Sequence, residues 1–136
     1  MENYIYIRSN EYWDTYNAYK LGGTRSIITE ECDHIMMEIK RGYYVKIVIV
    51  NTPLHIIMER LRKHFNKNGL NIYGTISSPF YDKDIENLLL PFLKKKEIAY
   101  KMLSIEDMNS IMECATKHHN KYDRCESVEK LSHFKS

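Results

Sequence analysis

The sequence predicts an α/β (α+β) fold, in which a small and mostly antiparallel sheet is flanked by helices. Three features predict it: a hairpin pattern in residues 3–22, a β-branched and aromatic run in residues 43–50, and helical periodicity on both sides of that run. With 136 residues, of which 43% are hydrophobic, the chain has the size of one domain and can bury one core. We expect a single domain over residues 1–136, divided into a core at 3–93, a C-terminal helical extension at 104–119 and a polar tail at 120–136.

The chain opens with a predicted β-hairpin. Residues 3–8 (NYIYIR) alternate along the chain and are rich in Tyr and Ile, which favours a strand. A polar and aromatic stretch at residues 9–17 separates this strand from residues 19–22, which complete the hairpin. The predicted hairpin therefore has a long connecting loop.

An amphipathic helix is predicted over residues 29–41. Thr29 is the expected N-cap, two glutamates follow it in the first turn, and Gly42 ends the helix. The apolar side chains at positions i, i+3, i+4 and i+7 are Cys32, Ile35, Met36 and Ile39. This spacing gives the helix one apolar face.

A central strand and a second helix come next. Residues 43–50 (YYVKIVIV) are almost continuously β-branched or aromatic, which is typical of a strand covered on both faces. The helix predicted over residues 54–67 has an apolar stripe made of Leu54, Ile57, Met58, Leu61 and Phe65. Glu59 points away from this stripe, so we expect its side chain to be exposed.

The second half of the chain is predicted from weaker patterns. Residues 70–81 contain Gly, Ser and Pro and are expected to form a loop, and a helix is expected over residues 82–93. Residues 98–103 favour a last strand. Ser104 and Asp107 then form the pattern of a capping box, which predicts the start of a final helix.

Composition limits where such a chain functions. No apolar run reaches the roughly 18 residues that a membrane span needs, and the N-terminus lacks the pattern of a signal peptide. Three cysteines without a disulfide spacing favour a reducing compartment. We therefore expect an intracellular protein of the cytoplasm or nucleus, with no membrane partner. The formal net charge of +2 is no larger than solubility alone accounts for.

The order of motifs resembles the GIY-YIG nuclease superfamily. The string YIYI, a gap, the string YKLGGT, a helix, a strand and a helix bearing MERL follow one another over residues 3–93. The likeness is greatest to the divergent viral and phage branch of the family, in which a YKIG-like string replaces YIG. The resemblance implies a GIY-YIG-like fold and is compatible with a protein made in a virus-infected cell.

The resemblance also implies a metal-dependent DNA endonuclease or nicking domain. Tyr6 takes the place of the family's first tyrosine, and either Tyr19 or Lys20 takes that of the second. Glu59 matches the glutamate that holds Mg²⁺ or Mn²⁺, and Arg25 is the nearest candidate for the phosphate-binding arginine. In this chemistry a tyrosine positions or deprotonates water, the cation neutralises developing charge, and an arginine clamps the phosphate.

One departure from the family pattern leaves a second interpretation open. The family's arginine lies further into the helix, where this chain has the acidic pair Glu30 and Glu31. The alternative is a catalytically degenerate module that binds nucleic acid or a protein partner without cleavage. In both interpretations Arg60, Arg62 and Lys63 are the expected nucleic-acid-binding residues, although a solvated helix face accounts for such a charge pattern as well.

Two other patterns bear on possible partners and ligands. Tyr12, Trp13 and Tyr16 could form an aromatic interface for a protein partner. The pattern C-x3-H-H-x5-C is formed by Cys114, His118, His119 and Cys125. It lacks the usual paired knuckles of a zinc site, so a polar tail is expected here and not a structural zinc ion.

Overall fold

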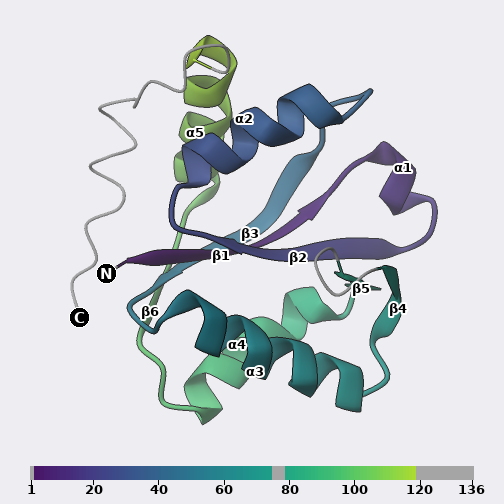
Figure 1. Cartoon of the computed structure of the whole chain (residues 1–136), viewed down its shortest axis with the longest axis vertical. Coiled ribbons are helices and arrows are strands. Elements are labelled where there is room, and N and C mark those ends of the chain that lie inside the picture. The colour runs from purple at the N-terminus through teal and green to yellow at the C-terminus, as the bar shows by residue number, and fades with distance from the viewer. Residues whose placement is uncertain (1, 75–78, 119–136) are drawn as a thin grey trace.

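In a computed structural model, the described residues 2–74 and 79–118 form a sandwich of three layers, with helices on both faces of one six-stranded sheet (Figure 1). The elements along the chain are β1 (Asn3–Ser9), α1 (Glu11–Asp14), β2 (Ala18–Thr24), α2 (Ile27–Met37), β3 (Tyr43–Val50), α3 (Leu54–Lys67), β4 (Asn71–Gly74), β5 (Pro79–Asp82), α4 (Ile85–Lys95), β6 (Tyr100–Met102) and α5 (Ile105–His118). The mixed fold with a flanked sheet agrees with the prediction.

The sheet has the strand order β4-β5-β2-β1-β3-β6, and every neighbouring pair is antiparallel. β1 is central and pairs with β2 on one side and β3 on the other, which places Tyr6 between Gly22 and Ile47. The predicted opening hairpin is confirmed. Its connection contains the short helix α1, whose N-cap Asn10 accepts a hydrogen bond from the backbone N–H of Trp13.

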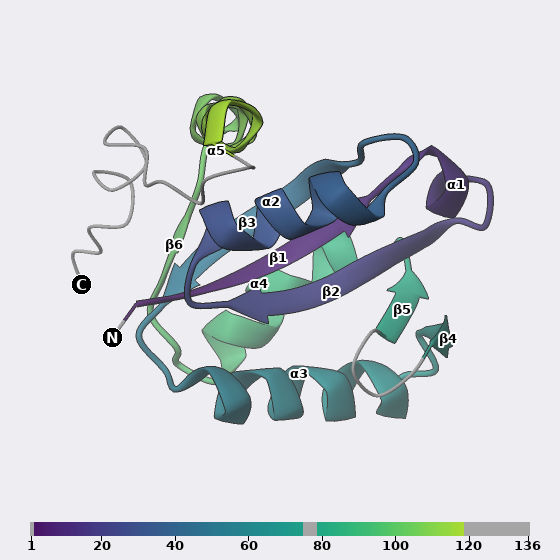
Figure 2. The ribbon, with the colours of Figure 1, turned by 45° about the horizontal axis from the view of Figure 1, so that its top comes forward.

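Alternating residues of β1 face different helical layers. Tyr4 and Tyr6 belong to the core shared with α2 and α5, whereas Ile5 and Ile7 belong to the core shared with α3 and α4. Figure 2 shows the two pairs of helices on opposite faces of the sheet. A strand residue therefore shares a layer with residues two positions away and not with its immediate neighbours.

The first long helix begins and ends earlier than predicted. Ser26, and not Thr29, is the N-cap of α2, because the Ser26 hydroxyl accepts a hydrogen bond from the backbone N–H of Thr29. The helix ends at Met37, and Glu38 is already extended. Ile39 is fully exposed, so the prediction that it continues the apolar stripe is wrong.

The prediction that residues 70–81 form a loop is also wrong. β4 and β5 lie in this segment, pair with each other, and extend the sheet beyond β2. The helix predicted over residues 82–93 runs from Ile85 to Lys95. Both differences arise where strand pairing, which local sequence does not reveal, decides the conformation.

The C-terminal helix is packed into the core. The predicted capping box is present, because the backbone N–H of Asp107 donates to the Ser104 hydroxyl at 3.1 Å and that of Ser104 donates to the Asp107 carboxylate at 3.3 Å. α5 buries Ile111, Cys114 and Ala115 in the cluster formed with α2 and the sheet. It is thus part of the folded core and more than an extension, while the expected polar tail lies outside the described residues.

Candidate functional site

Tyr6 lies beneath α2 and is almost completely buried, with 1% of its surface exposed. Its hydroxyl donates a hydrogen bond to Oε2 of Glu30 at 2.5 Å. The ring lies across β2 at Gly22, where a Cβ atom would be 2.2 Å from Cζ of Tyr6, so only glycine fits there. Burial, and then the Glu30 carboxylate, raise the pKa of Tyr6. The Tyr6 hydroxyl is therefore protonated and committed to Glu30.

Lys20 and His34 complete a polar cluster around Tyr6. Nδ1 of His34 is 2.8 Å from the carbonyl oxygen of Glu30, to which it donates, and Nε2 lies 3.3 Å from Nζ of Lys20. The His34 ring also meets the Tyr6 ring edge to face, with centroids 5.8 Å apart. Burial, followed by the charges of Arg8 and Lys20, lowers the pKa of His34 to about 4. We call Tyr6, Lys20, Glu30 and His34 the Tyr6 cluster, in which His34 is neutral.

A buried network of charges lies beside the Tyr6 cluster. Arg8 is 2% exposed, and its guanidinium forms ion pairs with Glu31 at 2.8 Å and Glu38 at 2.5 Å. Glu31 also pairs with Nε of Arg41 at 2.9 Å, and Arg41 donates to the carbonyl oxygen of Met112 on α5 at 2.7 Å. The network links β1, α2 and α5. Because its carboxylates hold both arginines, Arg8 is not available to an external phosphate.

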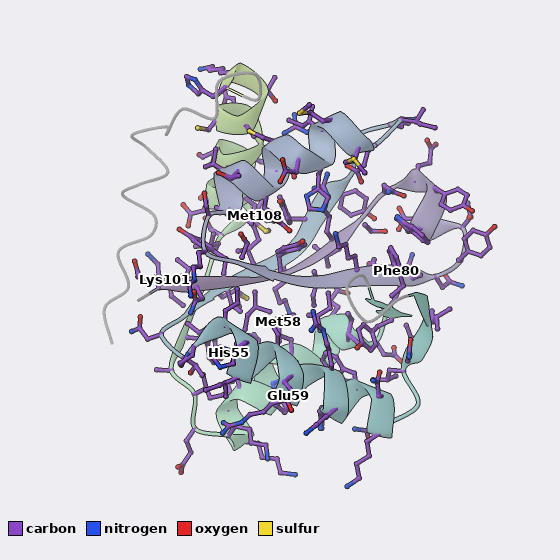
Figure 3. All side chains as sticks on the ribbon, viewed as in Figure 1. His55, Met58, Glu59, Phe80, Lys101 and Met108 are labelled. Carbon is purple, nitrogen blue, oxygen red and sulfur yellow. The ribbon has the colours of Figure 1, made fainter. Side chains whose placement is uncertain are left out.

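The structure brings together only two of the residues assigned by resemblance to catalysis. Tyr6 and Lys20 share the α2 layer, whereas Tyr19 packs in the core on the α3 side of the sheet. Arg25 is exposed between β2 and α2. Figure 3 shows Glu59 on α3, which lies across the sheet from α2, and its side chain is 64% exposed as expected.

Glu59, the residue expected to hold Mg²⁺ or Mn²⁺, forms an ion pair on the surface of α3. Its Oε1 atom is 3.0 Å from Nζ of Lys63, so its nearest charged partner is a cation. Within residues 2–74 and 79–118, no three His, Cys, Asp or Glu side chains are grouped to hold a metal ion. In the pattern C-x3-H-H-x5-C, Cys114 is buried in α5, while His119 and Cys125 lie outside the described residues.

The aromatic residues of and beside α1 are exposed or half-buried. Trp13 stacks on Phe80 of β5 with ring centroids 3.7 Å apart. Tyr12 and Tyr16 are exposed, and each lies close to its neighbours in the T-shaped pairs Tyr12–Trp13 and Tyr12–Tyr16. α1 lies at the far end of the β1–β2 hairpin, away from α3 (Figure 1).

The helices on the two faces of the sheet carry opposite charge. α2 has three acidic residues and no Lys or Arg, and α5 has three acidic residues and one Lys. α3 and α4 together have six Lys or Arg residues and two acidic ones. We call α2 with α5 the acidic layer and α3 with α4 the basic layer. The expected nucleic-acid residues Arg60, Arg62 and Lys63 lie in the basic layer, where Arg60 and Lys63 are exposed and Arg62 is half-buried.

Sequence reasoning missed Glu30 and His34 as members of the polar cluster. Both lie in the predicted helix at positions i and i+4, a spacing that puts two side chains on one face. The predicted apolar face of this helix, which contains Cys32 and Ile35, gives no indication that Glu30 and His34 lie against the opening hairpin. The spacing of an acid and a histidine was therefore the available signal.

Comparison of the chain with family models, with curated proteins and with solved structures gives no match in any of the three. Among the described helices, none is long and apolar enough to cross a membrane. Function therefore has to be inferred from the geometry of the Tyr6 cluster and from the charge of the two layers.

Proposed function

We propose that this chain is a catalytically degenerate GIY-YIG-like module that binds nucleic acid without cutting it. The observation that carries the proposal is the hydrogen bond from Tyr6 to Glu30. In the family that the sequence resembles, a tyrosine at this place acts beside an arginine that clamps phosphate. Here the tyrosine is bound to a carboxylate.

The Tyr6 cluster supports loss of cleavage for two reasons. A tyrosine that positions or deprotonates water must meet that water, yet Tyr6 is buried, its pKa is raised, and its hydroxyl is held by Glu30. A phosphodiester also needs a nearby cation for its negative charge, whereas Glu30 would repel it. Lys20 is the cation of the cluster, and burial lowers its pKa and so disfavours its charged form.

The basic layer supports nucleic-acid binding. Lys and Arg side chains that neutralise phosphates supply most of the sequence-independent affinity for nucleic acids. Lys63 is 77% exposed, and Arg60 is exposed one turn before it on the same helix. Because the basic layer and the Tyr6 cluster lie on opposite faces of the sheet, a phosphate bound by α3 does not meet Tyr6 (Figure 2).

The proposal is tested by measuring cleavage and binding together. Supercoiled plasmid is incubated with the protein and Mg²⁺ or Mn²⁺, and binding of labelled DNA is followed by fluorescence anisotropy over a series of salt concentrations. We expect no metal-dependent nicking, and binding that weakens steadily as salt rises. Folded protein that binds no DNA at low salt would overturn the proposal.

The variant Glu59→Gln separates the two interpretations of the fold. If Glu59 held a catalytic cation, the variant would abolish nicking, as a chelator would. In the binding module the variant removes an anion beside Lys63, and DNA affinity should rise about twofold or more. Glu113→Gln, which removes an exposed acid from α5, is the matched control and should leave affinity unchanged. Nicking that disappears in Glu59→Gln and in chelator would replace the binding proposal with an endonuclease.

A further inference from the structure

We infer that the ligand of the basic layer is the phosphate backbone of a nucleic-acid duplex, and that the surface extends from α3 to the C-terminal end of α4. The added residues are Lys67, Lys94, Lys95 and Lys96. This inference rests on the proposed function, and it names both the partner and a second half of the binding surface.

The C-terminal halves of α3 and α4 lie close together. The rings of His64 on α3 and Phe92 on α4 have centroids 4.9 Å apart. Burial, and after it the charges of Lys95, Lys96 and Lys67, lower the pKa of His64. Cations from both helices therefore contribute to one surface.

This surface has an excess of positive charge that the fold itself does not neutralise. Residues 59–68 and 89–97 contain seven Lys or Arg residues and two acids, Glu59 and Glu97, although the whole chain has a formal net charge of only +2. Lys67, Lys94, Lys95 and Lys96 are all exposed, and in the part of the chain that the structure describes none of them forms an ion pair. Lysines at a helix C-terminus also favour the helix dipole, but that effect does not require cations from two helices to gather. A polyanion is the complementary partner.

The lack of exposed Phe, Tyr or Trp side chains in the described part of the basic layer favours a duplex over a single strand, although His55 of α3 is exposed. Single-stranded nucleic acids are held by bases stacked on aromatic side chains, in addition to phosphate contacts. Phe65 and Phe92 are buried, and no residue of α3 or α4 is among the exposed large hydrophobic side chains of the described chain. The exposed tyrosines Tyr12 and Tyr16 lie on α1 instead. The described part of the basic layer can therefore contact phosphates but offers no exposed Phe, Tyr or Trp ring on which bases stack.

The experiment measures anisotropy of a labelled duplex of about two helical turns and of one of its strands alone, over a series of salt concentrations. The test variant is Lys95→Ala/Lys96→Ala. The control Lys40→Ala/Lys117→Ala removes two exposed cations from elsewhere, so both variants have the same net charge. Circular dichroism confirms that each variant is folded.

We expect the native protein to bind the duplex more tightly than the single strand. The test variant should lose about tenfold in duplex affinity, and its slope of log affinity against log salt should fall by about two. The control should stay within about twofold of the native protein, because contacts, and not net charge, determine the slope.

Each outcome supports or overturns one of the two proposals. If the native protein binds DNA but the test variant binds as tightly as the control, the inferred surface is wrong and the proposed function stands. Tighter binding of the single strand would overturn the choice of a duplex. If the folded native protein binds neither DNA, the proposed function itself fails.

Discussion

The acidic and basic layers use their charged residues in opposite ways. Beneath the acidic layer, Arg8 of β1 and Glu31 of α2 are buried, at 2% and 0% exposure, and each has a charged partner within 3 Å. In the basic layer Lys63 and Glu59 are 77% and 64% exposed. Buried charges must be paired, since an unpaired one loses its hydration without compensation, whereas exposed charges remain hydrated and can exchange water for a ligand.

This difference separates stability from binding. Substitutions in the acidic layer should change the free energy of unfolding and leave DNA affinity unchanged. Substitutions in the basic layer should do the reverse. Each of the following predictions would break or sharpen that separation, and they are ordered by the size of the effect expected on stability.

The largest effect is expected from Arg8→Met. The substitution leaves Glu38 without its arginine and Glu31 with Arg41 alone. The free energy of unfolding should therefore fall by about 3–5 kcal/mol. Urea denaturation at neutral pH measures the change. The double variant Arg8→Met/Glu31→Leu, which replaces the buried pair with apolar side chains, should recover part of the loss, because Glu38 still lacks its arginine and Arg41 loses its carboxylate. A single variant as stable as the native protein would show that the network does not hold the acidic layer.

A smaller effect is expected on acidification, through His34. Its pKa is about 4 in the folded protein against an ordinary value of 6.5, so His34 binds a proton in the unfolded chain before it does in the folded one. The contribution of neutral His34 to the free energy of unfolding is therefore complete above about pH 6.5. It is lost as pH falls toward 4, by up to ~3 kcal/mol. The positive charges of Arg8 and Lys20 disfavour protonation of His34, and the negative charge of Glu38 favours it.

His34→Gln isolates this contribution from that of the carboxylates. Burial raises the pKa of Glu31, whereas hydrogen bonds from Asn10, Gly42 and Arg8 outweigh burial and lower the pKa of Glu38. The proton binding of both carboxylates in acid therefore also changes on folding. Urea denaturation at several pH values should give the variant a shallower loss of stability than the native protein between pH 6.5 and 4. Equal losses in the two proteins would mean that His34 is not held neutral.

Periodic segments of this chain could be predicted from sequence, because their structure depends on neighbouring residues. The helix over residues 54–67 and the strand over residues 43–50 have the predicted bounds, and the Ser104–Asp107 capping box is present. β4 and β5 were missed because their pairing with each other and with β2 depends on residues far along the chain. The start of α2 was misplaced because Ser26 and Thr29 are both good N-caps, and the backbone selects Ser26.

The candidate site depends on strand register and on the faces that helices cover. Tyr19 and Lys20 are neighbours in sequence, and only the pairing of Tyr6 with Gly22 puts Lys20 on the side of Tyr6. The exposure of Glu59 followed from helical periodicity. Which face of the sheet α3 covers did not, because periodicity describes one helix and not its place in the fold.

A modest effect is expected from Tyr6→Phe. The ring is kept against Gly22, but the hydrogen bond to Glu30 is lost, which should reduce the free energy of unfolding by about 1 kcal/mol. Thermal and urea denaturation measure this change, and exposed Tyr12→Phe is the control. DNA affinity should not change in either variant. A loss of DNA affinity in Tyr6→Phe alone would show that the acidic layer takes part in binding.

The smallest effect on stability is expected from Arg60→Ala/Lys63→Ala in the basic layer. Both side chains are exposed, so the free energy of unfolding should stay within ~0.5 kcal/mol of the native value. Glu59 loses its partner in this variant but remains hydrated. Duplex affinity should nevertheless fall about tenfold, with a smaller salt slope, because two phosphate contacts are lost. Urea denaturation and anisotropy on one protein preparation measure both quantities. A variant that unfolds more easily and still binds DNA would reverse the roles assigned to the two layers, because the exposed cations would then stabilise the fold and not hold a ligand.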